Sequence, residues 1–217
     1  MNGILMTSEN HKATRELRKY QTRRLDHLKE INKEPDAWWL DEPNSRDGHF
    51  IFIHRAKETA PYLKEIEVKP RYQIGEVVYL KEVWRTGKGL DNLPPRLSGI
   101  NSPFQYKLDM HSIRGNSITK YSSWGKWRSP MFMPAWAARD FITITDVNLG
   151  RLQDITEEDA KAEGIEPIYK TTKAGYIWTP HGYRDGFINL WDSINPKYPW
   201  ASNPWNFKYS FQLKGGE

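Results

Sequence analysis

Short strand patterns follow one another along this chain with few helical segments between them. Residues 77–84 (VVYLKEVW) and 141–147 (FITITDV) are rich in the β-branched and aromatic side chains that favour strands. Near the end of the chain Phe207, Tyr209 and Phe211 alternate with polar residues, which is typical of a half-buried strand. Because no regular strand–helix–strand alternation is present, the pattern predicts an α+β fold, a small, mostly antiparallel β-barrel with flanking helices and long loop insertions.

Aromatic side chains must supply much of the hydrophobic core. The 217 residues include ten Trp, eleven Tyr and eight Phe. Each buried aromatic removes roughly 150–250 Å² from water, so these residues can build a core despite an apolar fraction of only 38%. The length predicts a single domain over residues 1–217.

Several classes of protein are disfavoured by composition. Cysteine is absent, which excludes disulfides and thiolate metal sites and suits a reducing, cytoplasmic location. The six histidines lack the H-E-x-x-H spacing of a zinc protease helix, and we expect no metal and no cofactor. No apolar run approaches the ~18 residues of a membrane span, and the first residues do not resemble a secretory leader, so we expect no membrane partner.

The helical segments are few. Residues 9–31 contain no Gly or Pro and fit one long helix capped by Ser8. A shorter helix that ends near Leu17, followed by an extended segment over 20–25, fits equally well. A second helix is predicted after Thr156, which can cap it, and a third over 183–194.

Positive charge is concentrated near the N-terminus. The formal net charge is +5, and residues 1–33 carry eight basic against four acidic side chains. Within them the segment RKYQTRR places an aromatic ring among cations. Such side chains can stack on a base while the cations hold phosphate, although a solvated helix face is the simpler alternative. The candidate nucleic-acid or substrate-binding residues here are Arg18, Tyr20, Arg23 and Arg24.

Several segments, taken in order, resemble a known family. They are KYQTRR, GEVVYLKEVW, WRSPMFMPAWAARDFITITDVNLGRLQDITEEDAKAEGI, YRDGFINLWDSIN and NPWNFKYSFQL. Their order resembles the ASCH domain proteins of phages and prophages, members of the PUA-like superfamily. The resemblance covers most of the chain and implies variable insertions at 34–70 and 85–123. The family motif is G-x-K-x-x-T-x-R. Lys19, Thr22 and Arg24 stand at its lysine, threonine and arginine, whereas Leu17 replaces its glycine.

This resemblance implies a function as well as a fold. It implies a small β-barrel with a cleft that binds RNA or a modified nucleoside. Some ASCH proteins remove the acyl group from N4-acetylcytidine, and another is a ribonuclease. Matching segment to segment, the resemblance implies that the catalytic residues are Lys19, Thr22 and Glu163.

The chemistry of these three side chains sets conditions on their geometry. The Thr22 hydroxyl is a weak nucleophile until a base removes its proton. Lys19 can act as that base only if burial or nearby cations lower its pKa. In an extended segment the two side chains would point to opposite faces, so the backbone would have to turn between them. Glu163 could hold the lysine, protonate the leaving amine or bind the exocyclic nitrogen of cytosine.

Two further residues are candidates for the site. Glu82 either pairs with an arginine such as Arg139 or lines the same cleft, and we place the pairing first. Arg139 could instead bind phosphate. Four functions stay open at this point: a non-catalytic RNA-binding module, an N4-acylcytidine amidohydrolase, a metal-independent ribonuclease using Lys19 and Glu163, or a protein-interaction module.

Overall fold

The chain forms two compact units that interleave along the sequence. The computed structural model describes residues 1–42, 48–54, 64–98, 104–109, 112–113, 123–172, 175–178 and 182–214. Unit 1 comprises Met1–Leu17, Val77–Thr143 and Leu213–Glu217, and unit 2 comprises Arg18–Glu76 and Ile144–Gln212. The single domain expected over residues 1–217 stays a prediction, and the two expected insertions lie partly outside the described residues.

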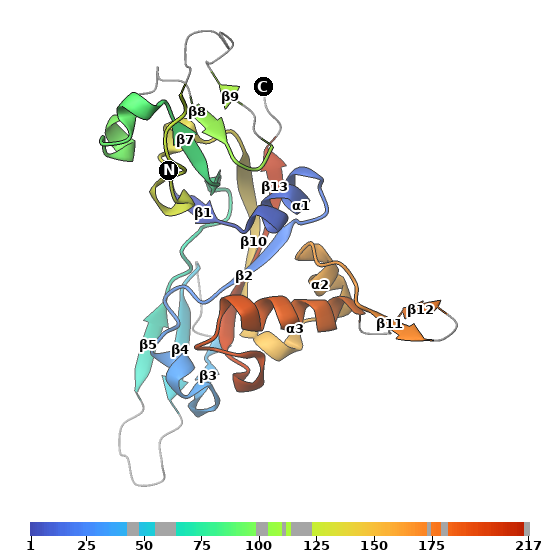
Figure 1. Cartoon of the computed structure of the whole chain (residues 1–217). Coiled ribbons are helices and arrows are strands. Elements are labelled where there is room, and N and C mark those ends of the chain that lie inside the picture. Colours follow the sequence, from blue (N-terminus) through green and yellow to red (C-terminus); the bar gives the residue numbers. More distant parts are fainter. Residues whose placement is uncertain are drawn as a thin grey trace. The chain divides into compact units, whose positions relative to one another are not determined.

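Unit 1 combines one end of a larger sheet with a small sheet of its own (Figure 1). Strand β1 pairs in parallel with β6, and β6 pairs antiparallel with the start of the long strand β10. Strands β7, β8 and β9 form an antiparallel sheet within the region expected as an insertion. The elements are β1 (Gly3–Leu5), α1 (Ser8–Arg15), β6 (Val77–Lys81), β7 (Trp84–Thr86), β8 (Phe104–Tyr106), β9 (Ser112–Ile113) and the beginning of β10 (Phe141–Arg151).

Unit 2 contains the other end of that sheet and two helices (Figure 1). Strand β2 pairs antiparallel with β13, and β13 neighbours β10. Strands β3, β4 and β5 form a separate antiparallel sheet, and β11 pairs with β12. The elements are β2 (Gln21–Arg24), β3 (Trp38–Leu40), β4 (Phe50–His54), β5 (Glu65–Val68), α2 (Glu157–Ala162), β11 (Tyr169–Thr172), β12 (Gly175–Trp178), α3 (Gly182–Ile194) and β13 (Trp205–Lys214).

The fold is α+β with mostly antiparallel sheets and few helices, as the strand patterns predicted. The largest sheet has the strand order β1-β6-β10-β13-β2, in which only the β1–β6 pair is parallel. Within the described residues no sheet closes on itself. None of the helices described there is both long and apolar enough to cross a membrane.

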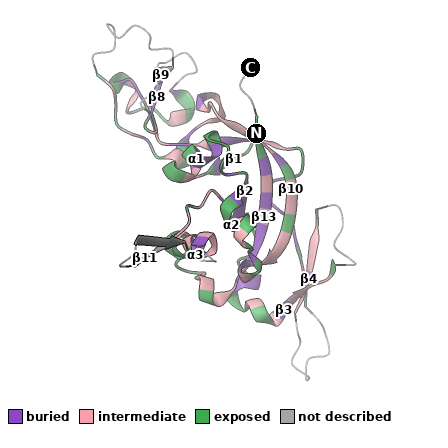
Figure 2. Ribbon diagram, turned by 90° about the vertical axis from the view of Figure 1, so that its right-hand side faces the viewer, coloured by how far each residue is buried: buried purple, intermediate pink, exposed green. Residues whose placement is uncertain are grey.

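Each unit has its own aromatic core. In unit 1 a buried cluster contains Trp84, Phe104 and Tyr106. In unit 2 the inner face of α3 contributes Phe187 and Trp191 to a cluster beneath α2. Buried positions recur along β13, as expected for a strand with one face in the core (Figure 2). The predicted role of aromatic residues in the core is therefore confirmed.

Several local predictions can be compared with the structure. Of the two alternatives for the N-terminal helix, the shorter one is correct, because α1 ends at Arg15 and an extended segment follows. Its cap is Thr7 rather than Ser8, because the Thr7 side chain accepts the Asn10 N–H. The strand expected over 77–84 divides into β6 and β7 around Glu82, whose N–H donates to Met133 Sδ at 3.3 Å.

Candidate functional site

The candidate site in unit 2 lies where the segment leading into β2 runs beside the end of α2. The Tyr20 N–H donates to the Ala162 carbonyl at 3.0 Å, and Lys19 forms an isolated antiparallel bridge with Glu163. In an extended segment, residues separated by two or four positions share a face. Lys19 and Arg23 therefore both point toward α2.

Helix α2 is positioned by its own sequence. Thr156 caps it by accepting the Asp159 N–H at 3.0 Å, and three acidic residues occupy the first turn. The helix ends at Ala162, Glu163 is its C-cap, and Gly164 follows with a left-handed φ of 77°. This sharp stop leaves Glu163 at the helix terminus, beside Lys19.

Lys19 and Glu163 form a buried ion pair. Lys19 Nζ donates to Glu163 Oε2 at 2.7 Å and to the Glu163 backbone carbonyl at 2.7 Å. Arg23 Nη1 donates to the other carboxylate oxygen at 3.2 Å. Lys19 is 2% exposed and Glu163 is 4% exposed. A charge this deeply buried needs partners, and here one carboxylate is shared between two cations.

Burial and neighbouring charges act on the pKa of Lys19 in opposite directions. Burial is the largest influence and lowers the pKa of Lys19, while the charge of Glu163 and its hydrogen bond raise it. The charges of Arg24 and Arg23 lower it further, and the net shift is downward. This meets the condition that the sequence set for Lys19 to act as a base.

Arg23 links this ion pair to a pocket in unit 2. Arg23 Nη2 donates to Asp159 Oδ2 at 2.8 Å, and Lys208 Nζ lies 3.5 Å from the other Asp159 oxygen. Burial raises the pKa of Asp159, but Arg23, Lys208 and hydrogen bonds from Gln21 and Arg23 lower it overall. The pocket has a volume of about 320 Å³, and its lining includes Arg23, Asp159, Lys208, Arg151, Asp154 and Asn206.

Thr22 lies on strand β2, three positions after Lys19. It stands opposite Tyr209 in the pairing of β2 with β13. Three positions separate it from Lys19, so its side chain points to the other face of the strand. In the described part of the chain, the side-chain hydrogen bonds of Lys19 and Glu163 join those two residues and Arg23, and none reaches Thr22.

The other predicted binding residues near the N-terminus differ in their exposure. Tyr20 is 52% exposed, and the half-exposed Arg18 donates to Glu166 at 2.9 Å. Arg24 is partly buried. Arg23 is buried between two carboxylates, which makes it a structural cation rather than a surface contact for phosphate.

Glu82 and Arg139 belong to unit 1 and pair with each other, which is the alternative that the sequence analysis placed first. Arg139 Nε donates to Glu82 Oε1 at 2.7 Å, and Nη2 donates to Oε2 at 2.9 Å. Arg139 also donates to Asp109 through Nη1, at 2.8 Å for the shorter bond. This bidentate geometry holds the Glu82 carboxylate firmly in place.

The Glu82 carboxylate also belongs to a cluster of three side chains that could act as metal ligands. His11, Glu82 and Asp140 each offer a ligand atom, and these atoms lie within 4.8 Å of one another. However, Arg139 Nε is 2.7 Å from Glu82 Oε1 and 3.7 Å from Asp140 Oδ2. A divalent ion there would lie within about 4 Å of this guanidinium, a repulsion of about 8 kcal/mol at an effective dielectric constant of about 20. The cluster therefore fits a protein ion network better than a metal centre.

Sequence reasoning missed several members of these networks. Asp159 lies one helical turn before Glu163, so the i, i+4 spacing on α2 could have identified it. His11 and Asp140 are 129 positions apart and meet at 2.8 Å. No spacing or motif in the sequence connects these two residues.

Comparisons with known proteins assign no family to this chain. No family model, curated protein or solved structure matches this chain. The ASCH resemblance rests on the sequence segments that carry it, and the geometry of the two units is the remaining basis for a function.

Proposed function

We propose that this chain is a nucleoside-binding protein of the ASCH, PUA-like type that hydrolyses the acyl amide of N4-acetylcytidine. The observation that carries the proposal is the buried 2.7 Å contact between Lys19 and Glu163, which are 144 positions apart. The resemblance selected both residues from motifs in separate segments. The β-barrel and the cytoplasmic location belong to the same proposal.

The pair can supply a proton shuttle. A neutral Lys19 amine takes a proton from a water molecule, whose oxygen then bonds to the acyl carbon. When the carbon–nitrogen bond breaks, the lysine ammonium returns that proton to N4, which leaves cytidine and a carboxylic acid, whose proton then passes to solvent water. Glu163 orients the amine through its hydrogen bond, and Arg23 balances the carboxylate charge.

We assign the attack to water rather than to Thr22. The resemblance would give the nucleophilic role to Thr22, but strand alternation directs its side chain away from Lys19. A threonine on the opposite face cannot transfer its proton to Lys19 without rotation of the strand. We therefore expect Thr22→Val to retain most of the turnover of the unchanged protein.

The pocket beside Arg23 is the proposed nucleoside site. Its volume of about 320 Å³ lies at the lower end of the range usual for small-molecule pockets. Its lining combines the cations Arg23 and Lys208 with the amide of Asn206, which suits a ligand with several polar edges. Because Arg23 both lines this pocket and donates to Glu163, it joins ligand binding to the ion pair.

A direct assay tests the enzymatic proposal. The purified protein is incubated with N4-acetylcytidine, and cytidine release is followed by chromatography. We expect Lys19→Met and Glu163→Gln to lower turnover by about 100-fold or more, the usual contribution of a positioned acid–base group. Lys161→Met is the matched control, since Lys161 is exposed on the same helix and should retain full activity.

Two outcomes would count against this assignment. Turnover that survives in Lys19→Met, with the fold verified by circular dichroism, would place the chemistry elsewhere. Intact substrate together with salt-dependent, Tyr20-dependent binding of single-stranded RNA would favour the non-catalytic module. The exposed Tyr20 ring is the observation that supports that second candidate, because exposed aromatics stack on bases.

A further inference from the structure

Unit 1 carries a second concentration of positive charge, around the sheet formed by β7, β8 and β9 (Figure 1). Residues 85–128 contain eight basic and two acidic side chains, a net charge of +6 that exceeds the +5 of the whole chain. The exposed cations among the described residues of this segment are Lys88, Arg96, Lys107 and Lys126. In the part of the chain that the structure describes, none of these four forms an ion pair, whereas Arg23 and Arg139 are bound to carboxylates.

The segment 123–128 runs along the edge of β7 that β8 leaves open. Isolated bridges join Gly87 to Trp124 and Trp84 to Arg128. Between these bridges the segment contains one residue more than β7, which is the definition of a β-bulge. A bulge redirects the side chains beside it, and Trp127 belongs to this one.

Arg85 contacts two tryptophan rings at this bulge. Its guanidinium carbon Cζ lies 4.2 Å from the ring centroid of Trp127 and 5.5 Å from that of Trp124, within the range of cation–π contacts. Gln105, opposite on β8, accepts Arg85 Nε at 2.9 Å and Nη2 at 2.6 Å through its Oε1. Both indole rings are partly exposed, so a fixed cation and two aromatic rings meet solvent together.

Contacts within unit 1 hold the segment in this conformation. The Asp91 carboxylate accepts the Lys126 N–H at 3.0 Å, and a Cβ at Gly125 would displace that carboxylate. Arg128 donates to the carbonyls of Leu90 and Leu93 at 2.6 and 3.0 Å. Because these contacts exist without a ligand, binding has to order little of the segment.

We propose that the tryptophan surface, made up of Arg85, Lys88, Trp124, Lys126 and Trp127, binds single-stranded nucleic acid. Indole rings offer unpaired bases a stacking platform that does not depend on base identity. The three cations neutralise the phosphates of the same strand. All five residues belong to unit 1, so this inference goes beyond the proposed function and does not rest on it.

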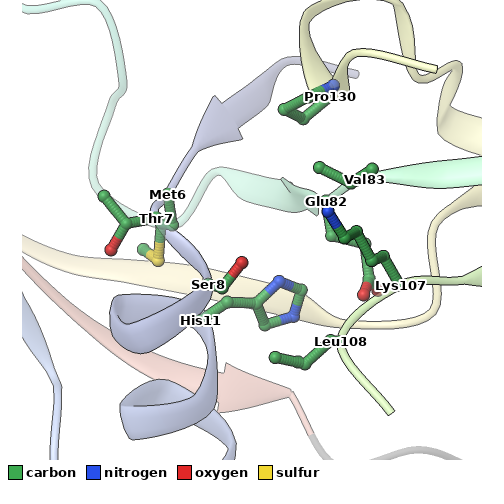
Figure 3. Close-up of a pocket in the computed structure, with 9 residues that line it drawn as sticks. All are labelled: Met6, Thr7, Ser8, His11, Glu82, Val83, Lys107, Leu108 and Pro130. Carbon is green, nitrogen blue, oxygen red and sulfur yellow. The ribbon is translucent and has the colours of Figure 1, made fainter. Parts of the chain in front are cut away.

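The chemistry of the surface selects this partner. The bases of a duplex are paired and stacked on one another, and their faces cannot reach an indole ring. A lone nucleoside carries no phosphate for the cations to bind. The pocket beside Glu82 in the same unit (Figure 3) does not provide a nucleoside site either, because its volume of about 20 Å³ holds about one water molecule.

Fluorescence anisotropy on the full chain tests the proposal. Labelled oligouridylate and oligothymidylate of about 12 nucleotides are titrated with the unchanged protein and its variants. We expect both strands to bind, and binding of one alone would support the surface and identify RNA or DNA as the partner. Trp127→Ala should weaken binding by about 5-fold or more, and Trp127→Phe should restore most of it because an aromatic ring is kept.

A charge variant tests the phosphate contacts separately. Lys126→Gln should weaken binding and reduce the slope of log K against log salt by about 0.7, the contribution of one phosphate contact with a single strand. Lys197→Gln is the matched control, since Lys197 is also exposed but belongs to unit 2, and it should change neither affinity nor slope. Circular dichroism verifies the fold of each variant.

Several results would overturn the inference. They are the absence of binding by the unchanged protein at low salt, equal affinity of Trp127→Ala, and loss of binding in Tyr20→Ala but not in Trp127→Ala, which would place the strand on unit 2. Binding to phosphatidylserine vesicles without binding to either oligonucleotide would identify a lipid surface instead. Turnover of N4-acetylcytidine should be unchanged in Trp127→Ala, which separates this inference from the proposed function.

Discussion

At the scale of single residues, Leu17 has an unusual backbone conformation. Its φ of 58° lies in the left-handed region, which glycine adopts without strain, and glycine is the residue that the ASCH resemblance would place at this position. Its side chain is 70% exposed, so little packing offsets the strain. The backbone therefore follows the glycine conformation although the glycine is absent.

Leu17→Gly should therefore stabilise the protein. A non-glycine residue in the left-handed region costs about 1–2 kcal/mol, and part of that gain is lost to the greater freedom of glycine in the unfolded chain. We expect the free energy of unfolding to rise by about 0.5–1 kcal/mol in urea denaturation. Leu97→Gly is the control: Leu97 is also exposed but lacks a positive φ, so that variant should be less stable. A loss of stability in Leu17→Gly would contradict the prediction.

The residue scale also shows where sequence reasoning reached its limit. Lys19 and Glu163 form a hydrogen bond across 144 positions, and Arg139 pairs with Glu82, the pairing that the sequence analysis placed first. The burial of Arg23 could not be read from the sequence, because a cluster of basic residues looks the same whether its cations face solvent or two carboxylates. For Thr22 to cooperate with Lys19 the backbone was expected to turn between them, and in the structure Thr22 already belongs to strand β2, which begins at Gln21.

At the scale of elements, helix α2 is the part whose boundaries the sequence predicted best. The capping threonine, the acidic first turn and the terminal glycine act through neighbours along the chain. Glu157 adds a tertiary link, because its carboxylate accepts the N–H groups of Tyr183 and Arg184 at the start of α3. Glu157 thus anchors the start of α2 to α3, and Lys19 and Arg23 contact Glu163 at its other end.

Thr156→Ala should destabilise helix α2. Loss of the cap leaves the Asp159 N–H without its side-chain acceptor and costs about 1 kcal/mol in the free energy of unfolding. Thr156→Ser keeps the hydroxyl and should restore most of the stability. Thermal denaturation of the two variants makes the comparison, and equal melting temperatures for alanine and serine would show that the cap contributes nothing.

For the strand expected over 77–84, in contrast, contacts with distant residues decided the boundaries. Its residues favour a continuous strand, yet β6 ends at Lys81 and β7 begins at Trp84. The break comes where Glu82 turns its N–H to Met133 and its carboxylate to Arg139, both distant in sequence. The β-propensity of these residues correctly predicted strands, and tertiary contacts determine where the strand is interrupted.

At the scale of the whole molecule, both units depend on carboxylates that are paired with cations. The pKa values of Asp140 in unit 1 and Asp159 in unit 2 are lower in the folded chain than their ordinary value of 3.8. Burial opposes this shift in each case, so the hydrogen bonds and positive neighbours more than offset it. The folded state therefore holds these carboxylates in their charged form.

Acid should consequently destabilise both units. Near and below about pH 4 the unfolded chain binds protons that the folded chain does not, so the free energy of unfolding falls as the pH decreases toward the folded pKa values. Asp159→Asn should reduce the steepness of this fall, because one of the protonation sites is removed. Urea denaturation at a series of pH values between about 5 and 2 measures the slope. An unchanged slope in Asp159→Asn would contradict this origin.

Patterns among neighbouring residues in the sequence were sufficient to predict the α+β class, the aromatic core, the capped helix α2 and the alternating strand β13. These features follow from side-chain periodicity and capping, which act between near neighbours. Folding alone established that His11 meets Asp140, that Arg23 is buried between Asp159 and Glu163, and that Thr22 lies opposite Tyr209. Such contacts depend on strand register and on how distant segments pack, and no pattern of neighbouring residues encodes them.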